Sequence, residues 1–210
     1  MKEIYTTVEK LAEAEIVEKR SRFIATVKPV LTEGEALEFL NELRQKYWNA
    51  THNVYAYIIE ENNIMRYSDD GEPGGTAGMP VLDILKKEGL TNLIVVVTRY
   101  FGGILLGTGG LVHAYSKSAK AGVEAAGLLD MVLCREVTLE CEYTLLGRLQ
   151  NEFSKWENII QGEPVYTDKV QMPVYLPVGE CDNFCSSITD KTNAQVSIIV
   201  GDTAYHSRRR

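Results

Sequence analysis

Apolar and polar residues alternate in the first hundred positions in a way that predicts several strands. SRFIATVKPVL (21–31) reads as a first strand because apolar residues alternate there with more polar neighbours. NVYAYII (53–59) is β-branched and aromatic, and the ENN turn followed by IMRYS (64–68) predicts its hairpin partner. LIVVVT (93–98) is a continuous apolar run, which is typical of a strand buried on both faces. We therefore expect this run in the centre of a sheet.

Helical patterns separate these strands. Thr32 followed by Glu35 forms a capping box at the start of the first helix. VLDILKKEG (81–89) predicts a short helix that Gly89 ends. A longer helix is expected from Gly110 to Gly127, after a glycine-rich turn, with small residues on the side that lies against the sheet.

A second pattern begins near Val137. A strand, a helix (145–157), two strands around a turn, a second helix and a last strand follow, which gives the βαββαβ order of a ferredoxin-like unit. The basic ending HSRRR is expected to be a loose, solvated tail. The chain therefore divides into residues 1–135 and 136–210, and its fold class is α+β.

Composition limits the possible functions. The chain has 210 residues, of which 45% are hydrophobic and 24% charged, as in an ordinary folded protein. Its net charge of −7 argues against extensive nucleic-acid binding, so any RNA contact must be small and clustered. The N-terminus has no apolar signal-peptide core, and no run reaches the roughly 20 apolar residues of a membrane span. We expect a cytoplasmic protein without membrane contact, whose four cysteines are reduced thiols used as small hydrophobic residues.

The stretch TRYFGGILLGTGGLVHAYSKSAKAG (98–122) is the main candidate for chemistry. A buried strand, a glycine-rich turn and a helix start place free backbone N–H groups at a positive helix end, where anions bind. His113 and Lys117 oppose the helix dipole unless something negative lies nearby, and Arg99 is placed to grip phosphate. No Walker A motif and no dinucleotide fingerprint is present. Alternatively, the glycines only allow tight turns and close packing.

The loop SDDGEPGGTAGMP (68–80) carries a group of carboxylates. Asp69, Asp70 and Glu72 are candidates to hold magnesium beside a phosphate, although such residues more often accept backbone hydrogen bonds in turns, with Gly71 left-handed. His52, at the mouth of a strand, is a candidate general base near neutral pH. No Ser/Cys–His–Asp order stands out, so hydrolase chemistry is disfavoured, and no cofactor is expected.

A basic cluster surrounds the first predicted strand, with Lys19, Arg20, Arg22 and Lys28. Together with the residues 99–101 it offers the charge and aromatic surface that single-stranded RNA recognition uses. The alternative is an ordinary solvated surface.

Several long motifs occur in an order that resembles one known family. RSRFIA, ATHNVYAY, YSDDGEPGGTAGMPVLDIL and VVVTRYFGGILLGTGGLVHAYSKS resemble the YigZ/Impact family, over about Ser21 to Gly127. Gly74 stands where the family motif leads us to expect serine, and His113 where we expect arginine, which weakens anion binding at the helix start or makes it pH-dependent.

The resemblance implies an N-terminal domain of the ribosomal protein S5 domain 2-like fold and a ferredoxin-like C-terminal domain. This pair is similar to the last two domains of elongation factor G, which suggests contact with ribosome or RNA. Eukaryotic Impact members restrain a starvation-responsive kinase that controls translation initiation, through protein contacts. The transfer of function from fold remains an analogy.

Two hypotheses follow. The first is a non-enzymatic, translation-associated regulatory protein that binds RNA, the ribosome or a translation factor, without sequence readout of DNA. The alternative is an enzyme that acts with Mg²⁺ on a nucleotide or phosphorylated small molecule. Contact with protein alone is a third possibility. The anion- or RNA-binding surface of the first hypothesis comprises Arg20, Arg22, Arg99, Tyr100, Gly102, Gly103, Gly107, Gly109, Gly110, His113 and Lys117. A possible secondary acidic site comprises His52, Asp69, Asp70 and Glu72.

Overall fold

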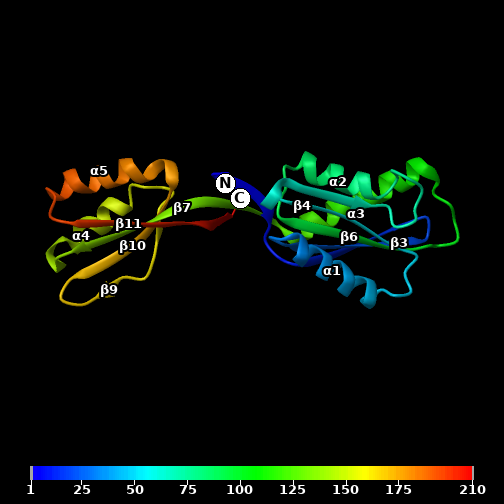
Figure 1. Cartoon of the computed structure of the whole chain (residues 1–210), viewed down its shortest axis with the longest axis horizontal. Coiled ribbons are helices and arrows are strands. Elements are labelled where there is room, and N and C mark those ends of the chain that lie inside the picture. The colour runs from blue at the N-terminus through cyan, green and yellow to red at the C-terminus, as the bar shows by residue number, and fades with distance from the viewer. Residues whose placement is uncertain (1, 210) are drawn as a thin grey trace. The chain divides into compact units, whose positions relative to one another are not determined.

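The computed structural model describes residues 2–209, which form two compact units (Figure 1). One unit comprises residues 5–130, and the other combines residues 2–4 with residues 131–208. The strand β7 (Leu128–Cys141) runs across this division and across the boundary predicted after residue 135. Each unit has its own sheet, helices and apolar core, so the predicted α+β class is confirmed.

The N-terminal unit contains a five-stranded antiparallel sheet in the order β2-β3-β6-β4-β5. Its strands are β2 (Ala12–Glu18), β3 (Ser21–Pro29), β4 (His52–Ile59), β5 (Ile64–Ser68) and β6 (Leu93–Tyr100). β6 is the central strand, as its apolar sequence predicts, and the hairpin of β4 and β5 is confirmed. β2 was not expected, because an edge strand with outward glutamates at alternate positions lacks the apolar run of a buried strand.

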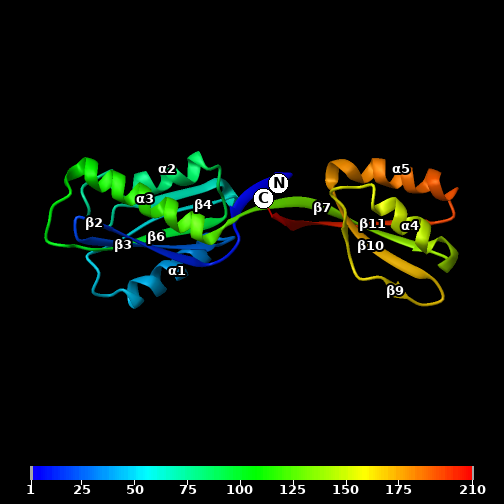
Figure 2. The ribbon, with the colours of Figure 1, turned by 180° about the vertical axis from the view of Figure 1, so that it is seen from behind.

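Three helices cover the two faces of this sheet. α2 (Gly78–Lys87) and α3 (Gly107–Ala126) lie on one face and α1 (Glu33–Lys46) on the other, as Figures 1 and 2 show. The predicted capping box is confirmed: the Glu35 N–H donates to Thr32 Oγ1 at 3.2 Å, and the Glu35 carboxylate accepts from the Leu31 N–H at 2.8 Å. α3 begins three residues earlier than predicted, because the glycines themselves form its first turn.

The C-terminal unit has the predicted βαββαβ order. Its strands are β7, β8 (Ile160–Gln161), β10 (Val170–Pro177) and β11 (Ser197–Arg209), with the short β9 (Val165–Tyr166) paired to β10. They lie in the order β11-β7-β10-β8, and β1 (Ile4–Val8) also pairs with β7. α4 (Leu146–Phe153) and α5 (Cys181–Thr192) contribute Leu149 and Phe184 to the core. This is the expected ferredoxin-like arrangement.

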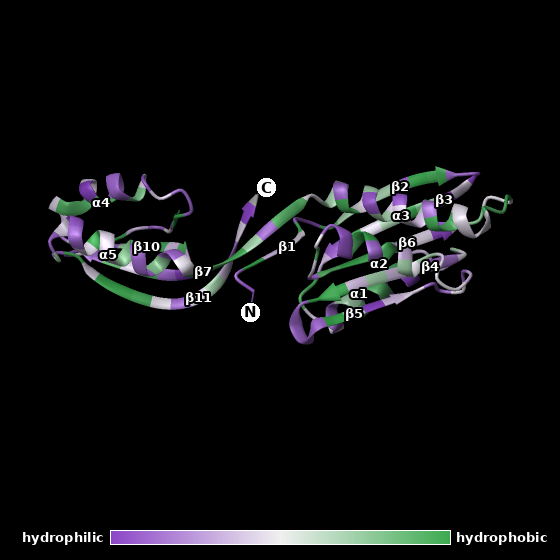
Figure 3. Cartoon of the chain, turned by 90° about the horizontal axis from the view of Figure 1, so that it is seen from above, coloured by the Kyte–Doolittle hydropathy of each residue, from purple (hydrophilic) through white to green (hydrophobic). Residues whose placement is uncertain are grey.

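Short 3-10 turns join several elements: η1 (Glu61–Asn63), η2 (Tyr143–Leu145) and η3 (Val178–Glu180). Hydrophilic and hydrophobic residues alternate along the helix ribbons, as in helices that bury one side (Figure 3). The expectation of a loose HSRRR tail is wrong, because residues 206–209 continue β11, while residue 210 lies outside the described residues. The four cysteines are free, and three of them are buried.

Candidate binding site

Three strand ends converge at one end of the N-terminal sheet. Arg22 in β3 lies opposite Tyr100 in β6, and His52 in β4 lies opposite Arg99. The N–H of Thr51 donates to the Arg99 carbonyl oxygen at 2.9 Å, and Thr51 Oγ1 accepts from the Phe101 N–H at 3.1 Å. Antiparallel pairing therefore brings together predicted site residues as far apart in the chain as Arg22 and Tyr100.

A buried ion pair joins the acidic loop to the end of β6. Glu72 Oε1 accepts hydrogen bonds from Arg99 Nη1 at 2.5 Å and from the Tyr115 hydroxyl at 2.7 Å. His52 Nε2 lies 3.8 Å from the same oxygen. Burial, followed by the Glu72 charge, raises the pKa of Tyr115, so its hydroxyl stays a neutral donor. The acidic loop and the glycine-rich segment thus lie together. The sequence alone did not show whether these two segments meet.

Arg99 is placed differently from the open phosphate grip that the sequence suggests. It is only 5% exposed, and its guanidinium carbon lies 5.3 Å from the Phe23 ring centroid and 5.7 Å from that of Phe101. Nη2 donates to Ser21 Oγ at 3.4 Å, whereas the buried Nε has no hydrogen-bond partner among the described residues. Arg99 therefore neutralises Glu72 and does not face an external anion.

The aspartates of the acidic loop act as turn residues. Asp69 Oδ1 accepts from the N–H groups of Ala77 (3.0 Å) and Gly78 (2.8 Å), and Oδ2 accepts from Gly75 at 2.8 Å. Among residues 2–209, no group of three or more His, Cys, Asp or Glu side chains is arranged to hold a metal ion. Asp69 therefore fixes the loop at the start of α2.

Asp70 and Gly71 complete the turn. Asp70 Oδ2 accepts from the Asn53 N–H at 2.6 Å, and Gly71 has a φ of +88°, the left-handed conformation that the turn interpretation predicts. Gly74 faces open space, so the serine expected from the family motif would fit there.

The tautomer of the neutral His52 ring follows from its partner. Nδ1 lies 2.7 Å from the backbone carbonyl oxygen of Asp70. A carbonyl oxygen only accepts, so Nδ1 must carry a proton. In the neutral ring Nε2 is then an acceptor, 3.8 Å from Glu72 Oε1.

A cleft of about 430 Å³ opens over this cluster. Its apolar walls are formed by Pro73, Phe101, Leu105, Leu106 and Leu111. The polar residues that line it are Thr51, His52, Glu72, Arg99 and Thr108, together with the backbone of Gly107. The sequence analysis did not identify Tyr115 as a site residue. The usable signal is that a buried tyrosine hydroxyl needs a hydrogen-bond partner.

The glycines serve two purposes. Gly102 packs so closely on the turn before β3 that a Cβ there would lie 2.1 Å from the Arg20 carbonyl carbon. Its N–H donates to Ser21 Oγ at 3.2 Å. This packing places Arg20 beside the segment that carries Phe101. Gly107, Gly109 and Gly110 form the first turn of α3, which has no side-chain cap, and Gly103 has a φ of +81°.

Exposed aromatic and basic side chains lie at the same end of the sheet as the cleft. Successive residues of a strand point to opposite faces, so Arg22 and Tyr100 lie on the α1 face, whereas Arg99 lies on the face covered by α3. The Arg22 guanidinium makes two hydrogen bonds to the Glu15 carboxylate (2.8 and 2.9 Å) and lies 5.5 Å from the Tyr100 ring centroid. The Tyr100 hydroxyl donates to Asn49, next to Trp48. Trp48 and Leu105 are each 82% exposed. We call the following set the rim: Arg20, Arg22, Trp48, Tyr100, Phe101, Ile104 and Leu105.

Three basic residues lie apart from the cleft. His113 and Lys117 are exposed on α3 but do not line it, and the earlier helix start puts both beyond the first turn, where the dipole effect has faded. The opposition to the dipole inferred from the sequence is therefore weak. Lys28 stacks on Phe39 of α1, at 4.9 Å from the ring centroid, on the other face of the sheet.

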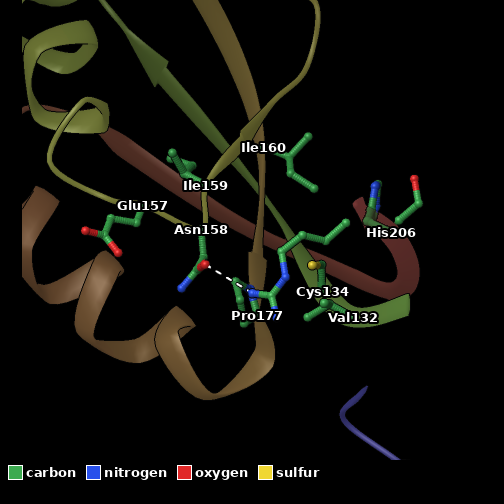
Figure 4. A pocket seen from close by; sticks show the side chains of 10 residues that line it. Val132, Cys134, Glu157, Asn158, Ile159, Ile160, Pro177 and His206 are labelled. Carbon is green, nitrogen blue, oxygen red and sulfur yellow. Dashed lines mark hydrogen bonds between the residues drawn. The ribbon is translucent and has the colours of Figure 1, made fainter. Parts of the chain in front are cut away.

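The C-terminal unit has a separate, smaller cavity of about 140 Å³ (Figure 4). Val132, Cys134, Pro177 and His206 line it, and Arg208 Nη1 donates to Asn158 Oδ1 at 3.3 Å beside it. Burial raises the pKa of the Cys134 thiol, so this group stays neutral at ordinary pH. No helix among residues 2–209 combines the length and apolar character needed to cross a membrane.

Comparison with known families gives two matches. The Impact N-terminal domain matches residues 19–123, which include the rim and the cleft. A domain of unknown function, DUF1949, matches residues 139–195.

Several proteins are similar over most of the chain. IMPACT family member YvyE of Bacillus subtilis is 42% identical over 96% of this chain and 93% of its own length. IMPACT family member YigZ of Escherichia coli is 31% identical over 86% of this chain and 90% of its own. The Protein IMPACT homolog of Dictyostelium discoideum is 43% identical over 47% of this chain and 29% of its own. A solved structure, described as "Crystal structure of an hypothetical protein", has a TM-score of 0.61, with 28% identity over 95% of this chain and 98% of that one.

Proposed function

The chain belongs to the IMPACT family, and on that premise we propose that it is a non-catalytic, cytoplasmic protein of translation whose rim binds unpaired RNA. The observation that carries the proposal is the arrangement of Arg22 on the Tyr100 ring, with Phe101 exposed beside it at the same end of the sheet. Exposed aromatic faces stack bases, and neighbouring arginines pair with phosphates.

The charge distribution supports a small contact. With a net charge of −7, the chain repels RNA overall, so binding must come from local groups such as Arg20 and Arg22. Both side chains are exposed, and Arg22 can exchange its Glu15 partner for phosphate at little cost because solvent screens the pair.

The alternative, an enzyme that uses Mg²⁺ at the acidic loop, receives less support. Asp69 and Asp70 accept backbone hydrogen bonds, and Glu72 is paired with Arg99. A metal ion would have to displace these contacts and would leave Arg99 buried without a counter-charge.

The test is the salt dependence of binding to single-stranded RNA, measured by fluorescence anisotropy between about 50 and 200 mM salt. We expect the logarithm of the association constant to fall by about 0.7 per phosphate contact for each logarithmic unit of salt. Arg20→Ala should reduce that slope by about 0.7. Phe101→Ala should weaken binding by about 1–3 kcal/mol, because one stacked base is lost.

Two residues of β5 provide matched controls. Arg66 and Tyr67 are also exposed, but they lie on the far edge strand of the sheet. Arg66→Ala and Tyr67→Ala should leave both affinity and slope unchanged. The proposal fails if RNA does not bind at low salt, or if these two variants weaken binding as much as the rim variants.

A further inference from the structure

We propose that the cleft over Glu72 receives the base of an unpaired guanine. The inference rests on the proposed function, because Phe101 and Leu105 of the rim, which also line the cleft, would hold the strand while the base enters. It assigns a ligand to a cavity whose walls are apolar and whose polar floor is formed by His52, Glu72 and Arg99.

The floor of the cleft offers hydrogen-bond acceptors. The His52 ring is fixed with its Nδ1 proton on the Asp70 carbonyl oxygen, so the neutral ring presents the lone pair of Nε2. Glu72 Oε1 already accepts two hydrogen bonds, from Arg99 and Tyr115. The remaining acceptor capacity of the carboxylate therefore lies on Oε2.

Arg99 and Tyr115 already donate to protein partners. Arg99 uses Nη1 for Glu72 and Nη2 for Ser21, and its Nε is enclosed. The Tyr115 hydroxyl donates to Glu72. His52 Nε2 and Glu72 Oε2 are therefore left as acceptors for N–H or O–H donors of a ligand, while Thr108 and the Gly107 backbone line another part of the cleft.

The charge of the floor favours a neutral ligand. Arg99 already neutralises Glu72 within a pair whose side chains are 6% and 4% exposed. An ammonium group placed beside this pair would bring a second positive charge without a counter-charge, which is costly in a partly buried site. Amide and amino N–H groups of a base carry no such cost.

Guanine is the base whose pairing edge best matches two acceptors. Its N1–H and 2-amino groups are adjacent donors, whereas the pairing edge of adenine has one donor beside one acceptor and that of cytosine has one donor beside two acceptors. Uracil has a single N–H between two carbonyl groups. Only guanine donates to both acceptors without also bringing a carbonyl or ring nitrogen against one of them.

The walls and size of the cleft suit a planar ring. Phe101 supplies an aromatic face at the mouth, and Leu105, Leu106 and Leu111 supply apolar contact. The volume of about 430 Å³ lies within the range of about 300–1,000 Å³ that small-ligand sites occupy.

The experiment compares three oligouridine strands of one length. The first carries a single central guanosine, the second inosine at that position, and the third uridine throughout. Inosine lacks only the 2-amino group, so the comparison removes one donor from the ligand and leaves the protein intact. We expect the guanosine strand to bind about tenfold tighter than the inosine strand.

Protein variants locate the contact. The proposal assigns the 2-amino group to His52 Nε2, so in His52→Ala the preference for guanosine over inosine should fall to about twofold or less, because the acceptor of that group is gone. Tyr67→Ala, on the far edge strand, should keep the full preference. If His52→Ala and Tyr67→Ala discriminate equally well, the cleft is not the guanine site.

The outcomes separate this inference from the proposed function. Equal affinity of the full-length protein for all three strands overturns the guanine assignment but leaves RNA binding by the rim intact. The absence of binding to any strand overturns both. A preference for guanosine over inosine that disappears in His52→Ala supports both.

Discussion

Two arginine–glutamate pairs lie close together at the end of the same sheet, in opposite environments. Arg22 and Glu15 face solvent, with side chains 52% and 41% exposed, and make two hydrogen bonds of 2.8 and 2.9 Å. Arg99 and Glu72 are almost completely enclosed. The register of β3 and β6 sets Arg22 opposite Tyr100, the residue after Arg99.

The difference in solvent exposure indicates what each pair contributes to stability and to binding. Solvent screens the outer pair, so breaking it costs little and leaves Arg22 available to another anion. The inner pair cannot be opened without leaving a buried charge, so it holds the acidic loop against β6. The enclosed pair therefore fixes the cleft on one face of the sheet, and the exposed pair on the other face stays free to exchange partners.

Removing one member of the inner pair should have the largest effect. We expect Arg99→Ala to lower the free energy of unfolding by about 3–5 kcal/mol, because Glu72 would stay buried and charged. Urea denaturation measures this change. A loss below about 1 kcal/mol would mean that the loop relaxes and exposes Glu72 to water.

Removing the third partner of Glu72 should cost less. Tyr115→Phe keeps the ring and its edge-to-face contact with Phe23, at a centroid distance of 5.1 Å, but removes the hydrogen bond to the carboxylate. We expect a loss of about 1.5–3 kcal/mol, the usual range for a hydrogen bond to a charged group. The same urea assay measures it, and a change equal to that of Arg99→Ala would show that the ion pair adds nothing beyond a hydrogen bond.

The close packing between rim and glycine segment can be tested at Gly102. A Cβ at this position meets backbone atoms of Arg20 and Ser21, which have little room to move. Gly102→Ala should therefore destabilise by about 1–3 kcal/mol, as overpacking does. Gly109→Ala is the control, because its Cβ meets no atom within 4 Å, and the change should stay within about 0.5 kcal/mol or stabilise.

Breaking the outer pair should have the smallest effect on stability. The hydrogen bonds from Arg22 lower the pKa of Glu15, so any stability it contributes is present at neutral pH and is lost as pH falls through that lowered pKa. We expect Arg22→Ala to leave the urea midpoint unchanged within error. NMR titration should show the Glu15 pKa returning to its usual range. A Glu15 pKa that is the same in both proteins would contradict the pairing.

Much of the fold could be predicted because local pattern and tertiary role agree. The apolar run of β6 allows only a central strand, and Thr32 with Glu35 determines where α1 begins. β2 was not predicted, because the sequence of an edge strand with alternating glutamates is similar to that of a solvated loop. The last residues of β11 were not predicted as strand because a basic, polar sequence at the end of a chain is typical of a solvated tail.

The site was predicted less completely, for a physical reason. Sequence identified the acidic loop and the glycine-rich segment separately, and it assigned Arg99 to an external phosphate. Whether Glu72 or solvent faces Arg99 depends on strand register, which side-chain type does not reveal. The same holds for the Tyr115 hydroxyl, whose partner lies 43 positions away in the chain.

The hydrogen bonds of the Asp70 carboxylate also affect how fast the chain is chemically modified during storage. An aspartate before glycine converts to isoaspartate when the following backbone nitrogen attacks the side-chain carboxyl carbon. Water is lost, and the resulting succinimide is hydrolysed at its other carbonyl group. Asp70 Oδ2 is instead bound to the Asn53 N–H at 2.6 Å, and Arg44 lies 3.5 Å from Oδ1. The folded loop thus keeps the carboxylate directed toward β4 and away from the Gly71 nitrogen. The Asp70–Gly71 bond should survive long storage while the protein is folded, and it should isomerise quickly once the protein unfolds.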